Sequence, residues 1–228
     1  MKRPRVALTH SAGRLDDLAA LLEERGFEVV RSPLVETVPR TDERTAAAAA
    51  TLMSLPWLLI TSRSTVEAIE ELGGFAEGPL IGAVGPATAA ALQEVGAMVT
   101  FVATPNNARG LAHAFLAHPL ARGPVGLPRG NRALETLEQE LGEAGFATRP
   151  LVVYDTRPQP WRGDGADALV LASPSAVEAL PTEVGSRSRL VTLGETTSAA
   201  VRSRGWRCEE AQEPTAQATL AALERVLA

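Results

Sequence analysis

The chain has 228 residues, of which 45% are hydrophobic and 21% are charged, and its formal net charge at pH 7 is -5. This length allows one large or two small domains with a hydrophobic core. The negative charge argues against a general nucleic-acid or membrane-surface binder, because those proteins need clustered positive charge. The sequence has no basic-then-apolar leader and no apolar run of 18 residues, so we expect a cytoplasmic protein without membrane contact.

Short apolar runs alternate with helical patterns along the first half of the chain. The patterns predict strands at residues 5–9, 28–31, 57–60, 80–84 and 98–103, and helices at 15–26, 41–55, 65–72, 85–96 and 109–116. Two proline-flanked segments, 32–39 and 149–158, each follow a Gly-Phe pair. Because proline cannot donate to a strand ladder, these segments favour extended connectors between domains over core strands.

The second half repeats the first. Segment 125–145, with a turn at Pro128–Asn131 and leucines from Leu134 onward in a helical pattern, matches the first strand and helix at an offset of 119. The strand at 168–172 and the helix after Ser173 match the segment Ile60–Ala68 at an offset of 111. Segment 190–205 matches the segment around Gly85–Gly96 at an offset of 109. The order of elements predicts a duplicated α/β unit with parallel sheets of about five strands. Taken alone, the repeat favours two contiguous halves.

Small polar residues recur where the predicted strands end and the helices begin. In open parallel sheets, ligands bind beyond the carboxyl ends of the strands, and free N–H groups at helix starts attract anions. The same residue types also serve as ordinary helix caps and turns. The candidate binding residues are Thr61, Ser62, Gly85, Thr88, Arg129, Asn131, Ser173, Ser175, Thr196 and Thr197.

Tyr154 is the only tyrosine of the chain. On the second connector it would place a phenol where two domains face each other, or it is a half-buried strand residue. The sequence contains no dinucleotide-binding or phosphate-loop glycine motif and no Ser-His-acid order. The single cysteine, Cys208, and three histidines argue against a metal cluster. What remains is a cofactor-free site of backbone amides, hydroxyls and one phenol.

The whole chain resembles the uroporphyrinogen-III synthase family. The resemblance rests on the order and spacing of several short pieces over nearly all of the sequence. They are Ile60–Ser62 with Thr65–Ala68, Val84–Ala89, Asn107–Leu111, Leu127–Asn131, Val153–Thr156, Ser173–Ser175, Leu193–Ala199 and Pro214–Leu220. His10 departs from the pattern, because bacterial relatives often carry arginine there.

The resemblance implies two flavodoxin-like parallel-sheet lobes joined by a two-stranded linker and able to hinge. Lobe 1 would comprise residues 1–36 plus 158–228, lobe 2 residues 37–157, and the crossings would lie near 32–40 and 149–158.

The implied activity is that of a cyclising lyase, which closes hydroxymethylbilane to uroporphyrinogen III with inversion of ring D and without metal or cofactor. By this resemblance Tyr154 assists departure of the hydroxyl, and Thr197 is the first choice among the binding residues. The substrate carries eight carboxylates, which backbone N–H groups at helix starts can bind without net positive charge on the protein. We expect a monomer in tetrapyrrole biosynthesis, with transient contact to hydroxymethylbilane synthase.

Two other functions fit the same residues. One is a non-catalytic two-lobed binding or sensor protein for a small polyanion, which only a turnover measurement separates from the enzyme. The other is a scaffold without a small ligand.

Overall fold

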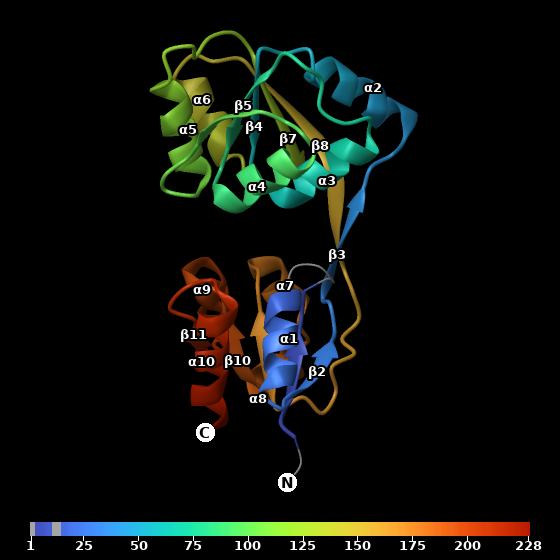
Figure 1. Cartoon of the computed structure of the whole chain (residues 1–228), viewed down its shortest axis with the longest axis vertical. Helices are drawn as coiled ribbons and strands as arrows, with labels where there is room; N and C mark the ends of the chain where they lie inside the picture. Colours follow the sequence, from blue (N-terminus) through green and yellow to red (C-terminus); the bar gives the residue numbers. More distant parts are fainter. Residues whose placement is uncertain (1–2, 11–14) are drawn as a thin grey trace. The chain divides into compact units, whose positions relative to one another are not determined.

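The computed structural model of the chain describes residues 3–10 and 15–228. The chain divides into two compact units, of which unit 1 comprises Met1–Glu36 and Arg157–Ala228 and unit 2 comprises Thr37–Thr156 (Figure 1). Both ends of the sequence therefore build unit 1, and the division is not into the contiguous halves that the repeat alone favours. Residues 11–13 of the loop expected after the first strand lie outside the described residues.

Unit 1 contains a five-stranded sheet in the order β11-β10-β9-β1-β2, and each of its neighbouring pairs is parallel. One hydrophobic cluster joins this sheet to two helices, and a second cluster joins it to α7 and α9. The strands are β1 (Arg5–Leu8), β2 (Glu28–Arg31), β9 (Ala168–Leu171), β10 (Arg189–Thr192) and β11 (Cys208–Glu210). The helices are α1 (Asp16–Glu24) and α10 (Ala216–Leu227) at the first cluster, then α7 (Pro174–Ala179), α8 (Thr182–Arg187) and α9 (Glu195–Ser203).

Unit 2 contains a six-stranded sheet in the order β3-β8-β7-β4-β5-β6. Helices α2, α3 and α4 share one hydrophobic cluster with it, and α5 and α6 share another. The strands are β3 (Val35–Pro39), β4 (Trp57–Ile60), β5 (Leu80–Ala83), β6 (Val99–Val102), β7 (Val125–Gly130) and β8 (Thr148–Pro158). The helices are α2 (Glu43–Leu52), α3 (Arg63–Glu71), α4 (Pro86–Glu94), α5 (Ala108–Leu116) and α6 (Thr136–Glu143).

The two sheets have the same spatial order once β3 is set aside. In unit 1 the strands, numbered along the chain, lie in the order 2-1-3-4-5, which is the flavodoxin-like order. Unit 2 has the same order if β7 is counted as its first strand and β8 as its second, so β7 takes the place of β1. The sequence repeat pairs segments that occupy equal places, because β7 matches β1, β4 matches β9 and β5 matches β10. The expected duplication is thus confirmed, and in chain order unit 2 is a circular permutation of unit 1.

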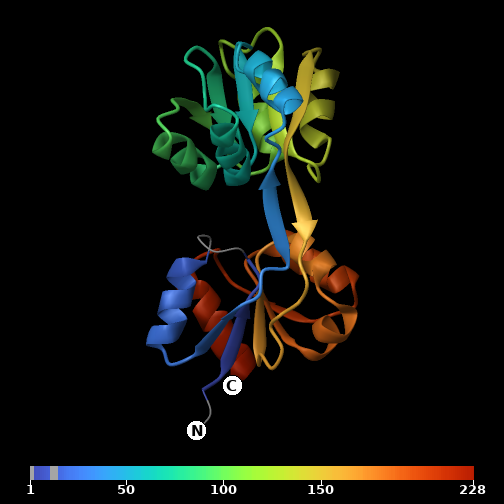
Figure 2. The ribbon, with the colours of Figure 1, turned by 90° about the vertical axis from the view of Figure 1, so that its right-hand side faces the viewer.

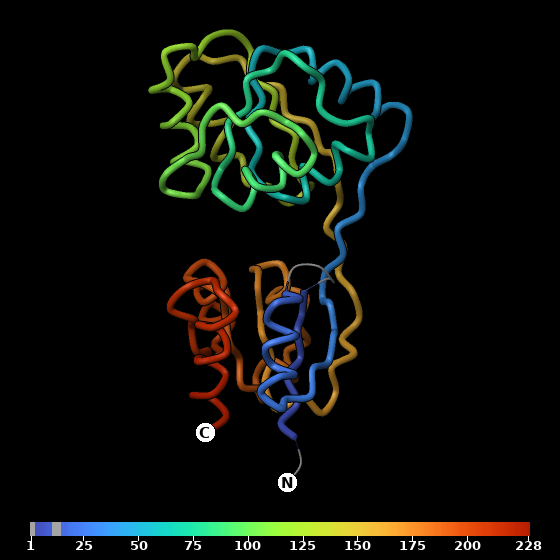
Figure 3. The backbone as a smooth tube through the Cα atoms, in the orientation of Figure 1, coloured from blue at the N-terminus to red at the C-terminus, as the bar shows by residue number. Residues whose placement is uncertain are grey.

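The segment predicted as the second crossing contains the boundary between the units, but it is also a sheet strand, which its prolines did not favour. Residues 148–158 form the eleven-residue strand β8, which pairs with β7 from Val125↔Thr148 to Gly130↔Tyr154. Its proline at position 150 is tolerated because β3 pairs only farther along, where the Arg40 N–H donates to the Val153 carbonyl at 2.9 Å. Figures 2 and 3 show the chain entering unit 2 through β3 and leaving it through β8, and in Figure 2 the arrows of these two strands point in opposite directions.

Other boundaries also shift. The turn predicted at Pro128–Asn131 is wrong for its first three residues, which belong to β7 because they pair with β8. Leu134 precedes α6 and is 81% exposed, so it does not contribute to the helix core. Helix α8 has no counterpart in the prediction. Within residues 3–10 and 15–228, no helix is long and apolar enough to cross a membrane.

Candidate functional site

The switch point of the unit 2 sheet lies between β7 and β4, the first and third strands in the flavodoxin-like order. Connections leave these neighbours toward opposite sides, which opens space beyond their carboxyl ends. Ser62 follows β4, and Gly130 ends β7. Tyr154 pairs with Gly130 from β8. Three residues of the predicted motifs therefore meet at this edge.

The phenol of Tyr154 is hydrogen-bonded to a serine. Its oxygen lies 3.2 Å from the Ser62 Oγ, and the Ser62 Oγ lies 3.0 Å from the Thr65 Oγ1. The Ser62 Oγ also accepts a hydrogen bond from the Thr65 N–H at 3.1 Å. These contacts form a short hydroxyl chain that can pass polarisation toward the phenol.

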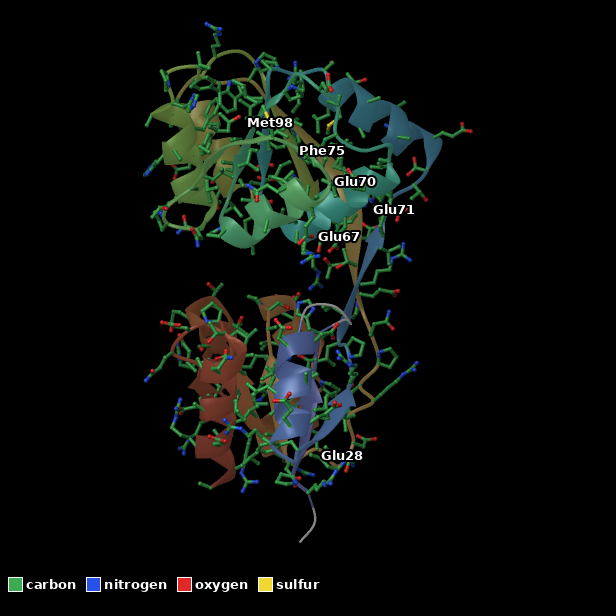
Figure 4. The ribbon with its side chains drawn as sticks, in the orientation of Figure 1. Glu28, Glu67, Glu70, Glu71, Phe75 and Met98 are labelled. Carbon is green, nitrogen blue, oxygen red and sulfur yellow. The ribbon has the colours of Figure 1, made fainter. Side chains whose placement is uncertain are left out.

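Helix α3 fixes the position of Ser62. Ser62 is its N-cap in an extended conformation, and residues Thr65, Val66, Ala68 and Ile69 are buried. The charged residues Glu67, Glu70 and Glu71 are exposed, as Figure 4 shows. This amphipathic pattern anchors α3 on the sheet and so holds the capping hydroxyl beside Tyr154.

Gly130 makes room for the tyrosine ring. A Cβ atom at this position would lie 2.5 Å from the Tyr154 Cε2 and Cζ atoms and 2.7 Å from its oxygen. The ring therefore lies directly across the end of β7, where every other residue type would displace it. Gly130 lies within one of the short pieces that carry the family resemblance, but it is not among the candidate residues that the sequence indicates.

Asn131 joins the end of β7 to the strand that carries Tyr154. Its N–H donates to the Tyr154 carbonyl at 3.1 Å, and its side-chain Oδ1 accepts from the Thr156 N–H at 2.9 Å. Asn131 therefore holds the backbone on both sides of Asp155. On the same strand, Asp155 accepts from the Arg40 guanidinium at 2.7 Å, and this hydrogen bond raises the pKa of Arg40.

Thr61 and Arg129 line a cavity at the same edge of the sheet. This cavity of about 330 Å³ lies among the ends of β4, β5 and β7, the start of α5, and α6. Arg129 pairs there with Glu138 of α6. Gly85 and Thr88 lie at the start of α4, where Thr88 is only 5% exposed.

The remaining candidates belong to unit 1. Ser173 caps α7 by accepting from the Ala176 N–H at 3.3 Å, and its Oγ lies 3.1 Å from the Ser175 Oγ. At the start of α9, Thr196 is exposed, whereas Thr197 is 5% exposed and offers little side-chain surface. The next residue, Ser198, is fully buried and lies 2.6 Å from the Thr192 Oγ1, a contact that sequence reasoning did not select.

A family model described as uroporphyrinogen-III synthase HemD matches residues 16–221. The chain belongs to the uroporphyrinogen-III synthase family. Family members are cyclising lyases of tetrapyrrole biosynthesis. A search of curated proteins gives no match.

Solved uroporphyrinogen III synthases share this fold over nearly the whole chain. A mutant of the enzyme from the extremely thermophilic bacterium Thermus thermophilus has a TM-score of 0.71 at 23% identity, covering 98% of each chain. The wild-type enzyme from the same bacterium, in another crystal form, has a TM-score of 0.54 at 25% identity, also over 98% of each chain. The enzyme from Helicobacter pylori has a TM-score of 0.57 at 17% identity, covering 100% of both chains.

In this uroporphyrinogen-III synthase family member, the predicted residues fall into separate groups. Ser62 and Tyr154 are in direct contact, Thr61 and Arg129 line one cavity, and Ser173 contacts Ser175. Within the described part of the chain, no three His, Cys, Asp or Glu side chains are grouped so that they could hold a metal ion.

Proposed function

We propose that the chain converts hydroxymethylbilane into uroporphyrinogen III, inverting ring D without a cofactor. The family match over residues 16–221 carries this proposal. The contact between Tyr154 and Ser62 at the switch point supports a site on unit 2 that can donate a proton.

Tyr154 is the proposed proton donor for the first step. A phenol keeps its proton at neutral pH and can donate to an oxygen on which charge develops. Ring A loses its hydroxyl as water when the carbon–oxygen bond breaks and the oxygen takes this proton, which leaves a protonated azafulvene and the Tyr154 phenolate. When the phenol turns its proton to the substrate, the Ser62 hydroxyl can donate to the phenol oxygen. Ring D then attacks through its substituted carbon, and the spiro intermediate fragments and recloses. The proton that ring D loses on reclosure can return to the Tyr154 phenolate, which restores the donor.

The carboxylates of the substrate are the proposed ligands of the helix starts. The first turns of α3, α4 and α9 follow strand ends and present N–H groups without an acceptor inside the helix, which attract anions. Thr61, Ser62, Gly85, Thr88, Thr196 and Thr197 belong to these turns, and Ser173 and Ser175 present hydroxyls at α7. The bilane also cyclises without an enzyme and then gives the uninverted isomer. The protein must therefore hold the two ends of the bilane in the geometry that leads to inversion.

The test supplies fresh hydroxymethylbilane to the purified protein, oxidises the products and measures the ratio of type III to type I porphyrin. We expect predominantly type III without added metal or cofactor. A ratio equal to that of the protein-free control, from protein that circular dichroism shows to be folded, would reject the proposal.

We also propose that the enzyme acts as a cytoplasmic monomer that takes its unstable substrate through transient contact with hydroxymethylbilane synthase. The spontaneous side reaction supports this, because rapid transfer limits the loss of substrate. Sedimentation of the chain alone, and type III yield with the two enzymes mixed or separated by a dialysis membrane, test both parts.

A further inference from the structure

The cavity between the sheet and helices α5 and α6 belongs entirely to unit 2. Its volume of about 330 Å³ is at the low end for small-molecule pockets, which hold roughly 300 to 1,000 Å³. It can therefore take part of a tetrapyrrole but not the whole molecule. Apolar residues form part of its lining, and polar residues contribute the rest. The apolar set includes Leu59, Val84 and Leu127, and the polar set includes Thr61, Asn106 and Asn107.

Charge in this cavity is confined to one pair. Among the described residues that line it, only Arg129 and Glu138 are ionisable. Their side chains are 20% and 16% exposed, and the Arg129 Nη1 donates to the Glu138 Oε1. The two charges cancel while the cavity is empty, which avoids an uncompensated cation in a partly buried position.

The guanidinium is not fully satisfied by this pair. The Arg129 Nε is enclosed by protein and has no hydrogen-bond partner among the described residues. A buried donor without an acceptor is unfavourable, and guanidinium groups bind carboxylates best through two parallel hydrogen bonds. The pair with Glu138 therefore leaves one donor of the guanidinium unused, and a carboxylate that replaces Glu138 could accept from this donor as well as from an Nη.

We propose that this cavity is a subsite for one carboxylate side chain of the substrate, with Arg129 as its cation and Glu138 as a competing anion. The proposal rests on the proposed function, whose substrate is a polycarboxylate. The incoming carboxylate displaces Glu138 from Arg129, while the methylene groups that carry it lie against Leu59 and Leu127. Glu138 thus weakens binding at this subsite, which keeps Arg129 paired when no ligand is present.

This arrangement makes the two partners act in opposite directions. Substitution Glu138→Gln removes the competing charge but keeps the size of the side chain, so we expect KM for hydroxymethylbilane to fall about threefold. Arg129→Gln removes the cation, so we expect KM to rise about tenfold, equivalent to about 1.4 kcal/mol. In both variants kcat stays within about twofold, because neither group contacts the reacting carbons.

The matched control is Glu140→Gln on the same helix. Glu140 pairs at 3.1 Å with Arg109, which is 73% exposed, and neither residue lines the cavity. We expect no change in its KM. In the double variant of Arg129→Gln with Glu138→Gln, the gain from Glu138→Gln disappears, since the two effects act through one contact.

A binding measurement separates this subsite from the catalytic proposal. Uroporphyrin, an unreactive octacarboxylate, is titrated into each variant and followed by its fluorescence. Tighter binding to Glu138→Gln and weaker binding to Arg129→Gln support the subsite even if the chain forms no type III isomer. Unchanged KM and unchanged uroporphyrin affinity in both variants, with thermal unfolding showing folded protein, would reduce the pair to a structural contact. If Arg129→Gln does not fold, the sign of the Glu138→Gln effect decides alone.

Discussion

The hydroxyl of Tyr154 has a defined partner, so its role can be separated from that of its ring. Tyr154→Phe keeps the ring over Gly130 but removes the phenol, and we expect kcat to fall by about 10² to 10⁴, the range for a general acid. Ser62→Ala removes the supporting hydroxyl and should lower kcat less. Single-turnover assays measure both, and full activity of Tyr154→Phe would exclude the phenol from the mechanism.

Gly130 offers a steric test at the same place. Gly130→Ala adds a Cβ atom 2.5 Å from the Tyr154 ring and 2.7 Å from its oxygen, so the ring must shift and its hydrogen bond to Ser62 is disturbed. We expect a loss of kcat similar to that of Ser62→Ala or larger, together with lower stability. The comparison is Gly142→Ala in α6, where a Cβ atom has no neighbour within 4 Å. There alanine should stabilise the helix by about 0.5 to 1 kcal/mol and leave kcat unchanged.

The residue types of this site can be predicted from the sequence, but the contacts between them cannot. Tyr154 stood out by being unique, and Ser62 by its place at a helix start. Their hydrogen bond joins residues 92 positions apart, which no local pattern encodes. The need for Gly130 appears only when β8 is aligned with β7, because its cause is a side chain on another strand.

At the scale of elements, the hydrogen bonds of Asn131, which connect the end of β7 to β8, should control the position of the phenol. Asn131→Ala removes the acceptor for the Thr156 N–H, so we expect about 1 kcal/mol of lost stability and a lower kcat. Asn131→Asp keeps an acceptor oxygen and should retain kcat. If Asn131 instead contacts the anionic substrate directly, the added charge of Asn131→Asp will raise KM strongly. Thermal unfolding and steady-state kinetics of both variants separate the two roles.

The start of α2 should respond to acid. Asp42 is its N-cap, and hydrogen bonds from the Thr45 hydroxyl and N–H lower the pKa of its carboxyl. Because the pKa of Asp42 is lower in the folded state, its carboxylate stabilises the fold at pH values above its pKa in the unfolded chain, which is about 3.9. This stabilisation is lost as the pH falls through the lower pKa of the folded state. Asp42→Ala should therefore unfold at a lower temperature than the wild type at pH 7, and the difference should narrow below about pH 4. A difference that stays constant down to about pH 3 would contradict this.

Most elements follow from local patterns, and the exceptions have tertiary causes. Four elements begin and end within one or two residues of the predicted positions: the capped helices α3 and α5 and the apolar strands β4 and β9. Strand β8 was missed as a sheet strand because its prolines indicate an edge or connector, whereas pairing with β7 overrides that preference. Helix α8 has six residues and too little periodicity to detect.

At the scale of the whole molecule, the repeat in the sequence and the division in space disagree. The sequence places the duplicated segments one after the other, whereas unit 1 is assembled from both ends of the chain. The disagreement disappears if unit 2 is regarded as a permuted copy inserted into unit 1, since both sheets have the same strand order. Domains tolerate such insertion where the flanking residues lie close together.

The flanking residues of unit 1 meet that condition. The Gln159 N–H donates to the Leu34 carbonyl at 2.7 Å, and the Gln159 side chain donates to the Glu36 carboxylate at 2.7 Å. Joining Glu36 to Arg157 by a Gly-rich turn of about three residues should therefore give a folded unit 1 without residues 37–156.

We expect that variant, and a separate fragment of residues 37–156, each to unfold cooperatively on heating, because each retains its own sheet and both hydrophobic clusters. Contiguous halves cut near residue 114 provide the control. That cut separates β4 and β5 from β7 and β8 of the same sheet, and β1 and β2 from β9. Circular dichroism and calorimetry should find the halves unfolded, and a cooperative transition in either half would show that the repeat, rather than the spatial division, defines the folding units.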